Sequence, residues 1–239
     1  MYLSIIIPAY NEEKRLAKTL IEVGEYLKKQ QFEYEIIVVD DGSTDMTTEI
    51  VMGMKNKIKN LYLINNDINH GKGFSVRRGL LYAKGQYRLF MDADNSTLIE
   101  EIENFLPYFK TYDIIIGSRN IKGSKIINRQ PAHRRILGSF YSLLVQIIIG
   151  LWGIKDTQCG FKLLSAKVVN HVLPRCKIND WAFDSEILII AKKLGYKIKE
   201  IPITWSDQPQ TKVRFLGMVR MIFDLLKIRW NLATKKYKA

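Results

Sequence analysis

The sequence predicts an α/β protein with a mostly parallel β-sheet and helices on both of its faces. Three observations support this fold class. Short apolar runs alternate with stretches of helical periodicity over the first 120 residues. The runs are nearly continuous and rich in β-branched residues, which is typical of strands buried on both faces. Polar residues directly follow several runs, and in parallel sheets ligands bind beyond the carboxyl ends of the strands.

Five of the apolar runs are predicted strands, at residues 3–8, 35–39, 61–65, 87–91 and 114–117. Helices are predicted between them at residues 12–31, 45–57 and 73–84. The first helix has the clearest pattern, because its apolar residues recur at intervals of four, three and four positions and so share one face. These residues are Leu16, Leu20, Val23 and Leu27.

The composition is that of a packed globular protein with an unusual charge balance. Of the 239 residues, 47% are hydrophobic, which excludes a disordered chain. Lys and Arg number 37 against 24 Asp and Glu, so the formal net charge is +13. Such a field attracts polyanions, and nucleic acid, anionic lipid headgroups and phosphorylated ligands are all candidate partners.

The two cysteines and the first residues both favour a cytoplasmic protein. Cys159 and Cys176 provide neither a disulfide framework nor the paired spacing of a zinc site. The first apolar run is short and has no basic flank, so it is predicted to be a buried strand and not a signal peptide.

Two polar segments follow the first and second predicted strands. Pro8-Ala9-Tyr10-Asn11-Glu12 follows the first, and Asp40-Asp41-Gly42-Ser43-Thr44-Asp45 follows the second. Each segment alone is compatible with a turn, since Asp-Gly is a turn dipeptide and serine or threonine can cap a helix. At neighbouring strand ends, however, a carboxylate can accept from the imino N–H of a base, and a tyrosine can pack on that base.

The segment Asn69-His70-Gly71-Lys72-Gly73 precedes the third predicted helix. Glycines let the backbone approach a phosphate, a helix N-terminus favours negative charge, and Lys72 adds a cation. A plain glycine-containing loop is the alternative interpretation.

The sharpest feature is Asp92-Ala93-Asp94, directly after the fourth predicted strand. Two carboxylates two positions apart bring hard oxygen donors to one point, which suits Mg²⁺ or Mn²⁺ bridging a diphosphate. A bound metal would also remove the repulsion between the two carboxylates. The alternative is a solvated acidic turn.

Residues 136–154 carry no formal charge over 19 positions, nominally enough to span a bilayer. Serines, a glutamine and glycines lower the hydropathy of this segment, so we expect a helix that lies in the plane of a membrane surface, with Arg134 and Arg135 at the headgroups. A membrane-spanning helix and a buried core helix are the alternatives.

Residues 213–239 are predicted to form a basic amphipathic helix, a pattern typical of membrane-surface elements. A polar face opposes an apolar one: Arg220, Asp224 and Lys227 against Phe223, Leu226 and Trp230. We therefore expect a catalytic domain at residues 1–212, which contains the membrane-interface helix at about 136–154, followed by this C-terminal helix.

Taken in order, these motifs resemble the family 2 inverting glycosyltransferases, which have the GT-A fold, a Rossmann-like α/β architecture. The second half of the chain resembles the dolichyl-phosphate β-glucosyltransferase branch, which is close to the dolichyl-phosphate mannose synthases. The matching segments there are Gly117-Ser118-Arg119, Asp156-Thr157-Gln158-Cys159-Gly160-Phe161-Lys162, Trp181-Ala182-Phe183-Asp184-Ser185-Glu186 and Asp224-Leu225-Leu226-Lys227-Ile228-Arg229. The resemblance covers about residues 3 to 230.

The resemblance implies roles for individual residues. Those that hold the nucleotide-sugar are Pro8, Ala9, Tyr10, Glu12, Asp40, Asp41, Gly71, Lys72, Asp92 and Ala93. The main metal ligand is Asp94, with Asp92 nearby, and Ser96 stands where the mannose synthases can have a glutamine. The acceptor phosphate is held by Arg119, Arg135 and Ser139, with Arg134 adjacent. The family's Gly-Ser-Lys is Gln210-Thr211-Lys212 here, which keeps the lysine but loses the glycine.

The implied activity is transfer of a hexose from a nucleotide-sugar, UDP-glucose being the expected donor, to a polyprenyl or dolichyl phosphate with inversion. Mg²⁺ or Mn²⁺ is the implied cofactor, and Asp94, Arg119, Arg135 and Lys212 are the implied catalytic residues. Because a phosphate acceptor is already anionic, a general base is less necessary than for a sugar hydroxyl. Asp184 and Glu186 are therefore expected to orient the acceptor or a loop, or merely to complement a helix dipole.

Other functions stay open on the sequence alone. A mannose synthase that uses GDP-mannose and a transferase with a soluble saccharide acceptor fit the same motifs. A sugar nucleotidyltransferase is disfavoured, because it needs a glycine-rich basic loop where this chain has residues 8–12. A basic nucleic-acid-binding protein explains the charge but not the Asp-Ala-Asp motif, so we expect no nucleic-acid partner. The expected location is the cytoplasmic face of a membrane, peripherally attached; the oligomeric state is left open.

Overall fold

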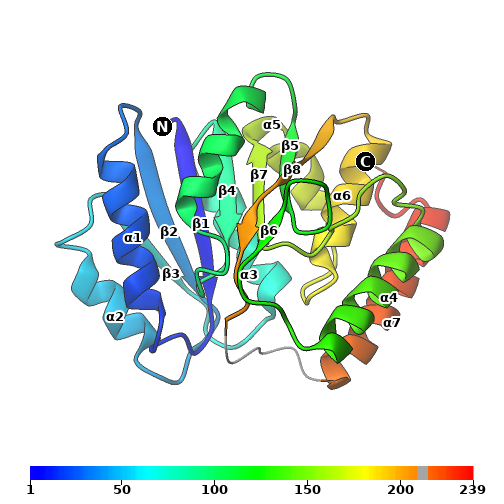
Figure 1. Cartoon of the computed structure of the whole chain (residues 1–239), viewed down its shortest axis with the longest axis horizontal. Coiled ribbons are helices and arrows are strands. Elements are labelled where there is room, and N and C mark those ends of the chain that lie inside the picture. Colours follow the sequence, from blue (N-terminus) through cyan, green and yellow to red (C-terminus); the bar gives the residue numbers. More distant parts are fainter. Residues whose placement is uncertain (209–214, 239) are drawn as a thin grey trace.

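The structure, a computed structural model, describes residues 1–208 and 215–238. Its centre is a seven-stranded sheet with the order β3-β2-β1-β4-β7-β5-β8, and β6 and β9 form a separate two-stranded sheet (Figure 1). The strands are β1 (Leu3–Ala9), β2 (Tyr34–Asp40), β3 (Leu61–Asn65), β4 (Tyr87–Met91), β5 (Ile114–Ser118), β6 (Lys125–Ile126), β7 (Phe161–Ser165), β8 (Ile198–Pro202) and β9 (Thr204–Trp205).

The central sheet is parallel except for one strand. β7 runs antiparallel to both of its neighbours, β4 and β5. Consequently the residue before β7, Gly160, lies at the same edge of the sheet as the residues that follow β4. The expected mostly parallel α/β architecture is therefore confirmed.

Two hydrophobic cores cover the two faces of this sheet. On one face, Ile5 and Ile7 of β1 pack with α1 (Leu16–Lys28), α2 (Thr47–Met54) and the 3₁₀ turns η1 (Ile99–Asn104) and η2 (Leu106–Tyr108). On the other, Ile6 of β1 packs in a core with the remaining helices. These are α3 (Lys72–Tyr82), α4 (Ala132–Ile149), α5 (Ala166–Val172), the turn η3 (Leu173–Arg175), α6 (Phe183–Lys193) and α7 (Phe215–Ala233).

The uncharged stretch at 136–154 is mostly helix α4, which begins at Ala132, ends at Ile149 and is followed by Gly150 in the left-handed conformation. α4 and α7 lie side by side at one end of the molecule (Figure 1). One side of α4 is core, through Tyr141, Val145 and Ile149, as the buried-helix alternative requires. The opposite side faces outward, and no helix within the described ranges has the length and apolarity to cross a bilayer.

Candidate active site

The sequence-predicted polar segments meet at one edge of the sheet. Ala9, Asp40 and Asn65 are aligned across β1, β2 and β3. Met91 ends β4 beside them, and Ser118 ends β5 further along the same edge. Because all these strands are parallel, the residues that follow them gather at their carboxyl ends, where α/β proteins bind ligands.

Asp40 and Asp41 are both buried and both brace loops at this edge. Asp40 accepts from the backbone N–H of Ser43 at 3.0 Å and from its hydroxyl, and also from the hydroxyl of Thr48. Asp41 accepts from the Asn66 amide at 2.6 Å and from the backbone N–H of Gly71 at 2.8 Å. The two carboxylates thus hold the start of α2 and the 66–71 loop in place.

Pro8, Ala9, Tyr10 and Glu12 line the same edge. Tyr10 is 37% exposed, so its ring is accessible beside the strand ends. Glu12 is buried and pairs with Arg15, and its backbone N–H donates to Thr47 at 2.7 Å. The first and second polar segments are therefore joined directly.

Lys72 is the first residue of α3 and points its ammonium at the acidic motif. Its Nζ lies 2.5 Å from Asp92 Oδ1 and 5.3 Å from the centre of the Trp181 ring. Burial opposes the charged form of Lys72, but Asp92 and Asp184 outweigh it, so the pKa of Lys72 is raised and the cation is retained. The predicted glycine loop thus delivers its lysine to the Asp-Ala-Asp motif.

Gly160 leaves room for the Asp92 side chain and accepts a hydrogen bond from its backbone. The Asp92 backbone N–H donates to the Gly160 carbonyl at 3.1 Å. A Cβ at position 160 would lie 2.0 Å from Asp92 Oδ2, closer than any side chain can approach. Glycine is therefore required here for the carboxylate to sit against the start of β7.

Asp94 lies beside Asp92 and is half-buried. Its Oδ1 accepts from the Ser96 backbone N–H at 2.9 Å, and its Oδ2 is 3.9 Å from an Arg15 nitrogen. Burial and the neighbouring Asp92 raise the pKa of Asp94. The Ala93 carbonyl between them accepts from Thr19 of α1 at 2.8 Å, which fixes the turn after β4.

The acidic motif can supply two carboxylate ligands to a metal ion. Among the described residues no three His, Cys, Asp or Glu side chains come together as a ligand set. Two hard oxygen donors at one point, where burial and the neighbouring Asp92 raise the pKa of Asp94, fit a divalent cation that would take its other ligands from a diphosphate and water.

Arg119 follows β5 and is bound by Asp156. The guanidinium donates from Nε at 2.7 Å and from Nη2 at 2.8 Å, and the Arg119 backbone N–H adds a third contact at 2.9 Å. Burial would raise the pKa of Asp156, but Arg119 outweighs it and the pKa is lowered. The guanidinium also lies over the Trp205 ring, 5.3 Å from its centre.

Lys162 and Asp184 form a further ion pair, which sequence reasoning did not identify. Both side chains are almost fully buried, with Nζ 2.6 Å from Asp184 Oδ1. Burial raises the pKa of Asp184 against the opposing effect of Lys162. Glu186 is also fully buried and accepts from the backbone N–H groups of Lys177 and Ile178. The signal in the sequence is a lysine, Lys162, at the second position of the otherwise apolar run at residues 161–164.

Three of the remaining predicted site residues have no hydrogen bond or ion pair to this cluster within the described part of the chain. Arg134, Arg135 and Ser139 lie in the first two turns of α4, with Arg135 and Ser139 exposed. Lys212 lies outside the described residues. Ser96 is buried, and the contact to Asp94 comes from its backbone.

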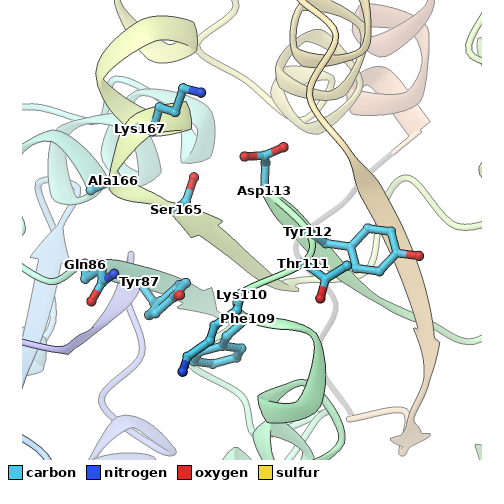
Figure 2. A pocket seen from close by; sticks show the side chains of 10 residues that line it. All are labelled: Gln86, Tyr87, Phe109, Lys110, Thr111, Tyr112, Asp113, Ser165, Ala166 and Lys167. Atoms are coloured by element: carbon cyan, nitrogen blue, oxygen red, sulfur yellow. The ribbon is translucent and has the colours of Figure 1, made fainter.

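A shallow cavity of about 220 Å³ lies at the opposite edge of the sheet (Figure 2). Its lining includes Tyr87 at the start of β4 and Ser165 at the end of β7, which pair with each other. It is therefore separated from the acidic motif by the length of β4.

Comparison with known proteins agrees with this geometry. The family model for glycosyl transferase family 2 matches residues 4–173. The chain is 38% identical over 236 residues to the dolichyl-phosphate beta-glucosyltransferase ALG5A of Trichomonas vaginalis, covering 95% of this chain and 73% of the relative. The dolichyl-phosphate beta-glucosyltransferases of Saccharomyces cerevisiae and Homo sapiens are 34% and 33% identical, covering 96% and 99% of this chain and 74% and 77% of theirs.

Solved structures share the fold at lower identity. Glucosyl-3-phosphoglycerate synthase from Mycobacterium tuberculosis, in complex with Mn²⁺, UDP and glucosyl-3-phosphoglycerate, superposes with a TM-score of 0.69 at 19% identity, covering 95% of this chain and 79% of that one. Mannosyl-3-phosphoglycerate synthase from Rubrobacter xylanophilus gives 0.71 at 16% identity, covering 100% and 76%. From the family match and the alignment of nearly the whole chain with these relatives, the chain belongs to glycosyl transferase family 2 and is a glycosyltransferase of the dolichyl-phosphate beta-glucosyltransferase group.

Proposed function

We propose that this enzyme transfers glucose from UDP-glucose to a polyprenyl or dolichyl phosphate, with inversion at C1, at the cytoplasmic face of a membrane. The observation that carries the proposal is the meeting of Asp92, Asp94 and Lys72 at the carboxyl edge of the sheet. Two carboxylates that can hold a divalent metal, beside a lysine ammonium, would together stabilise the negative charge of a nucleoside diphosphate leaving group. The relatives named for the same reaction support the sugar and the acceptor.

The nucleoside end of the donor belongs with residues 8–12 and the Asp40–Asp41 pair. Tyr10 has the exposure to pack on a base. Asp40 and Asp41 already accept internal hydrogen bonds, which orients their oxygens, and each carboxylate has capacity for a further donor. Gly71 places the backbone at the start of α3, where a phosphate is favoured.

In this proposal Asp94 and Asp92 hold Mg²⁺ or Mn²⁺, with Ser96 fixing Asp94. A metal held there would supply positive charge to offset the negative charge of the departing diphosphate. Lys72 contributes a second positive charge from the protein, and Lys212 is proposed to add a third. Each of these groups acts most strongly on the charge that develops as the bond to C1 breaks.

A general base is not part of the mechanism. The acceptor phosphate is anionic at neutral pH and attacks C1 from the side opposite the nucleotide, so protein groups need only position it. The nearby carboxylates already have partners: Asp184 forms an ion pair with Lys162, and Glu186 accepts from backbone N–H groups. This supports the expectation that neither abstracts a proton.

Arg119 is proposed to meet the acceptor phosphate. Asp156 engages its Nε and Nη2 groups, which fixes the plane of the guanidinium and leaves Nη1 to face an oxyanion. Arg134, Arg135 and Ser139, at the start of α4, are proposed to guide the phosphate from the headgroup region. A membrane surface is required, because withdrawing an isoprenoid tail from lipid costs about 0.8 kcal/mol per CH₂.

The outer faces of α4 and α7 support the membrane location. Each helix exposes apolar side chains at intervals of four, three and four residues. We name these side chains the apolar face: Ile136, Phe140, Leu143 and Ile147 of α4, and Val219, Phe223, Leu226 and Trp230 of α7. Exposed cations lie alongside, at Arg135, Arg220, Lys227 and Arg229. A large exposed apolar patch with basic neighbours is the pattern of an interfacial surface.

The test is a screen of nucleotide-sugars with a short polyprenyl phosphate, followed by extraction of labelled lipid. We expect UDP-glucose to label the lipid, with a chelator abolishing transfer. Labelling by GDP-mannose alone would make the enzyme a mannose synthase, and labelling of a soluble saccharide in place of the lipid would refute the acceptor.

A further inference from the structure

The end of the chain is anchored to the loop that packs on Lys72. We propose that Tyr237 is a positioning residue, which acts through Glu186 and residues 176–182, the 176–182 loop, to hold the Lys72 side of the active site. The inference rests on the proposed function for its kinetic consequence but not for its structural one.

The first link joins Tyr237 to Glu186. The Tyr237 hydroxyl donates to Glu186 Oε1 at 2.6 Å, and both side chains are buried. Asn231 of α7 donates to the same hydroxyl at 3.3 Å. Burial and the Glu186 carboxylate raise the pKa of Tyr237, so the hydroxyl stays protonated and remains a donor. The C-terminal turn is therefore tied into α6 from the end of α7 (Figure 1).

The second link joins Glu186 to the 176–182 loop. Its carboxylate accepts from the Lys177 N–H at 2.9 Å and from the Ile178 N–H at 2.9 Å. The Lys177 N–H also reaches Oε1 at 3.0 Å, so Oε1 is shared by Lys177 and the Tyr237 hydroxyl and Oε2 by Lys177 and Ile178. Removing the hydroxyl leaves a buried carboxylate with one donor fewer, a loss that favours a shift of Glu186 and of the loop it holds.

The third link joins the 176–182 loop to the start of α3. The Phe74 N–H donates to the Asn179 carbonyl at 3.0 Å, and Arg77 donates to the Asn179 side chain at 2.7 Å. The fit is close, since a Cβ on Gly71 would lie 2.5 Å from the Asn179 carbonyl oxygen. Within the same loop, the Trp181 ring lies over the Lys72 ammonium.

These links connect the proposed membrane helix to the ammonium that faces the leaving group. Phe223 and Trp230 lie on the outer side of α7, while Asn231 donates to the Tyr237 hydroxyl, which in turn donates to Glu186. Since Lys72 acts on charge that develops in the transition state, its misplacement lowers kcat more than it weakens donor binding.

The kinetic test compares Tyr237→Phe, which keeps the ring, with Tyr82→Phe, whose ring is 51% exposed at the far end of α3. We expect Tyr237→Phe to lower kcat about fivefold, with KM for UDP-glucose within twofold of wild type. Tyr82→Phe leaves both unchanged. In a Trp181→Leu background, Tyr237→Phe is expected to have almost no further effect on kcat, because both changes break the same chain of contacts.

A second measurement does not depend on activity. Amide hydrogen exchange at residues 177–179, followed by mass spectrometry, is expected to be about tenfold faster in Tyr237→Phe than in wild type or Tyr82→Phe. Unchanged exchange would overturn the proposal whether or not glucose is transferred. A lower Tm with normal kcat in Tyr237→Phe would also overturn it. So would effects of Tyr237→Phe and Trp181→Leu on kcat that are fully additive. If wild type transfers no glucose, the proposed function fails, and hydrogen exchange still decides the role of Tyr237.

Discussion

Within residues 1–208 and 215–238, Asp94 differs from its neighbour Asp92 in forming no ion pair with a lysine. Its Oδ2 lies 3.9 Å from an Arg15 nitrogen, whereas Lys72 contacts Asp92 at 2.5 Å. The carboxylate less neutralised by protein is the one that gains most from a bound metal.

We therefore expect Asp94→Ala to lower transfer by about a hundredfold, because metal charge on the leaving group is lost. Stability should match that of Glu25→Ala, an exposed acidic residue on α1. Activity assays and thermal melts of both variants make the comparison. Wild-type turnover in Asp94→Ala would show that Asp94 does not hold a metal needed for transfer.

Asp156 has a structural role that can be measured through pH. Its pKa is below the ordinary value of 3.8, so its contribution to stability is present above that value and is lost as pH falls through the lowered pKa. At pH 7, Asp156→Asn should reduce the free energy of unfolding by about 3 kcal/mol, the typical cost of breaking a buried ion pair.

The difference between wild type and Asp156→Asn should begin to shrink below about pH 4, where Asp156 of the unfolded chain takes up a proton, and should be lost once the pH falls below the lowered pKa of the folded protein. Denaturant unfolding at several pH values gives this difference. If the difference in the free energy of unfolding stays constant down to the most acidic pH, the packing of the Asp156 side chain, and not its charge, holds Arg119.

Among the elements, the approach of β7 to β4 determines where Asp92 sits. Gly160→Ala should displace the Asp92 carboxylate, since a Cβ would meet it at 2.0 Å. We expect affinity for UDP with Mn²⁺ to fall about tenfold. The control is Gly53→Ala on α2, where a Cβ meets nothing within 4 Å. Calorimetry with UDP and Mn²⁺ measures the affinity of both variants. Equal affinities would contradict the close approach of Gly160 to the Asp92 carboxylate.

The apolar face of α4 and α7 makes a prediction about vesicles. Replacing Phe223 and Trp230, which are 66% and 63% exposed, by serine should weaken binding to anionic vesicles about tenfold for each side chain. Folding should be unaffected, because the buried side of α7 is Met221, Leu225 and Ile228. Leu81→Ser, an exposed leucine on α3, is the control in vesicle co-sedimentation. Binding unchanged by the double substitution would show that these helices do not meet the lipid.

Sequence patterns predicted some elements well and missed others for physical reasons. Each of the five predicted strands has a counterpart, because continuous apolar runs report burial on both faces. β7 was missed because Lys162 interrupts its apolar pattern. Only the folded chain brings Asp184, 22 positions away, to neutralise that lysine.

The same limit applies to the candidate site. The Asp-Ala-Asp motif and Lys72 could be predicted, because local sequence places each directly at a strand end or helix start. The commitment of Arg119 to Asp156 could not, since the two lie 37 positions apart. Likewise, the helical pattern of 213–239 indicated one apolar face, whereas α7 has an exposed apolar stripe and a buried one.

At the scale of the whole molecule, the proposed membrane attachment accounts for both the positive charge and the two-helix apolar face. In this proposal the net charge of +13 attracts the protein to an anionic surface, and α4 and α7 insert their exposed apolar side chains there. In the proposed reaction the enzyme comes to the lipid phosphate, while the nucleotide-sugar reaches the sheet edge from water. Inversion follows if attack on C1 occurs opposite the diphosphate held by Asp92, Asp94 and Lys72.

The most direct test of this account is the structure of the product. UDP-α-glucose labelled with ¹³C at C1 is incubated with the enzyme, Mn²⁺ and vesicles that contain a polyprenyl phosphate, and the extracted lipid is examined by NMR. The account predicts a β-linked glucosyl phosphate, formed with metal and absent with chelator. An α-linked product would contradict single displacement at this site, and label found only on soluble molecules would contradict the lipid phosphate acceptor.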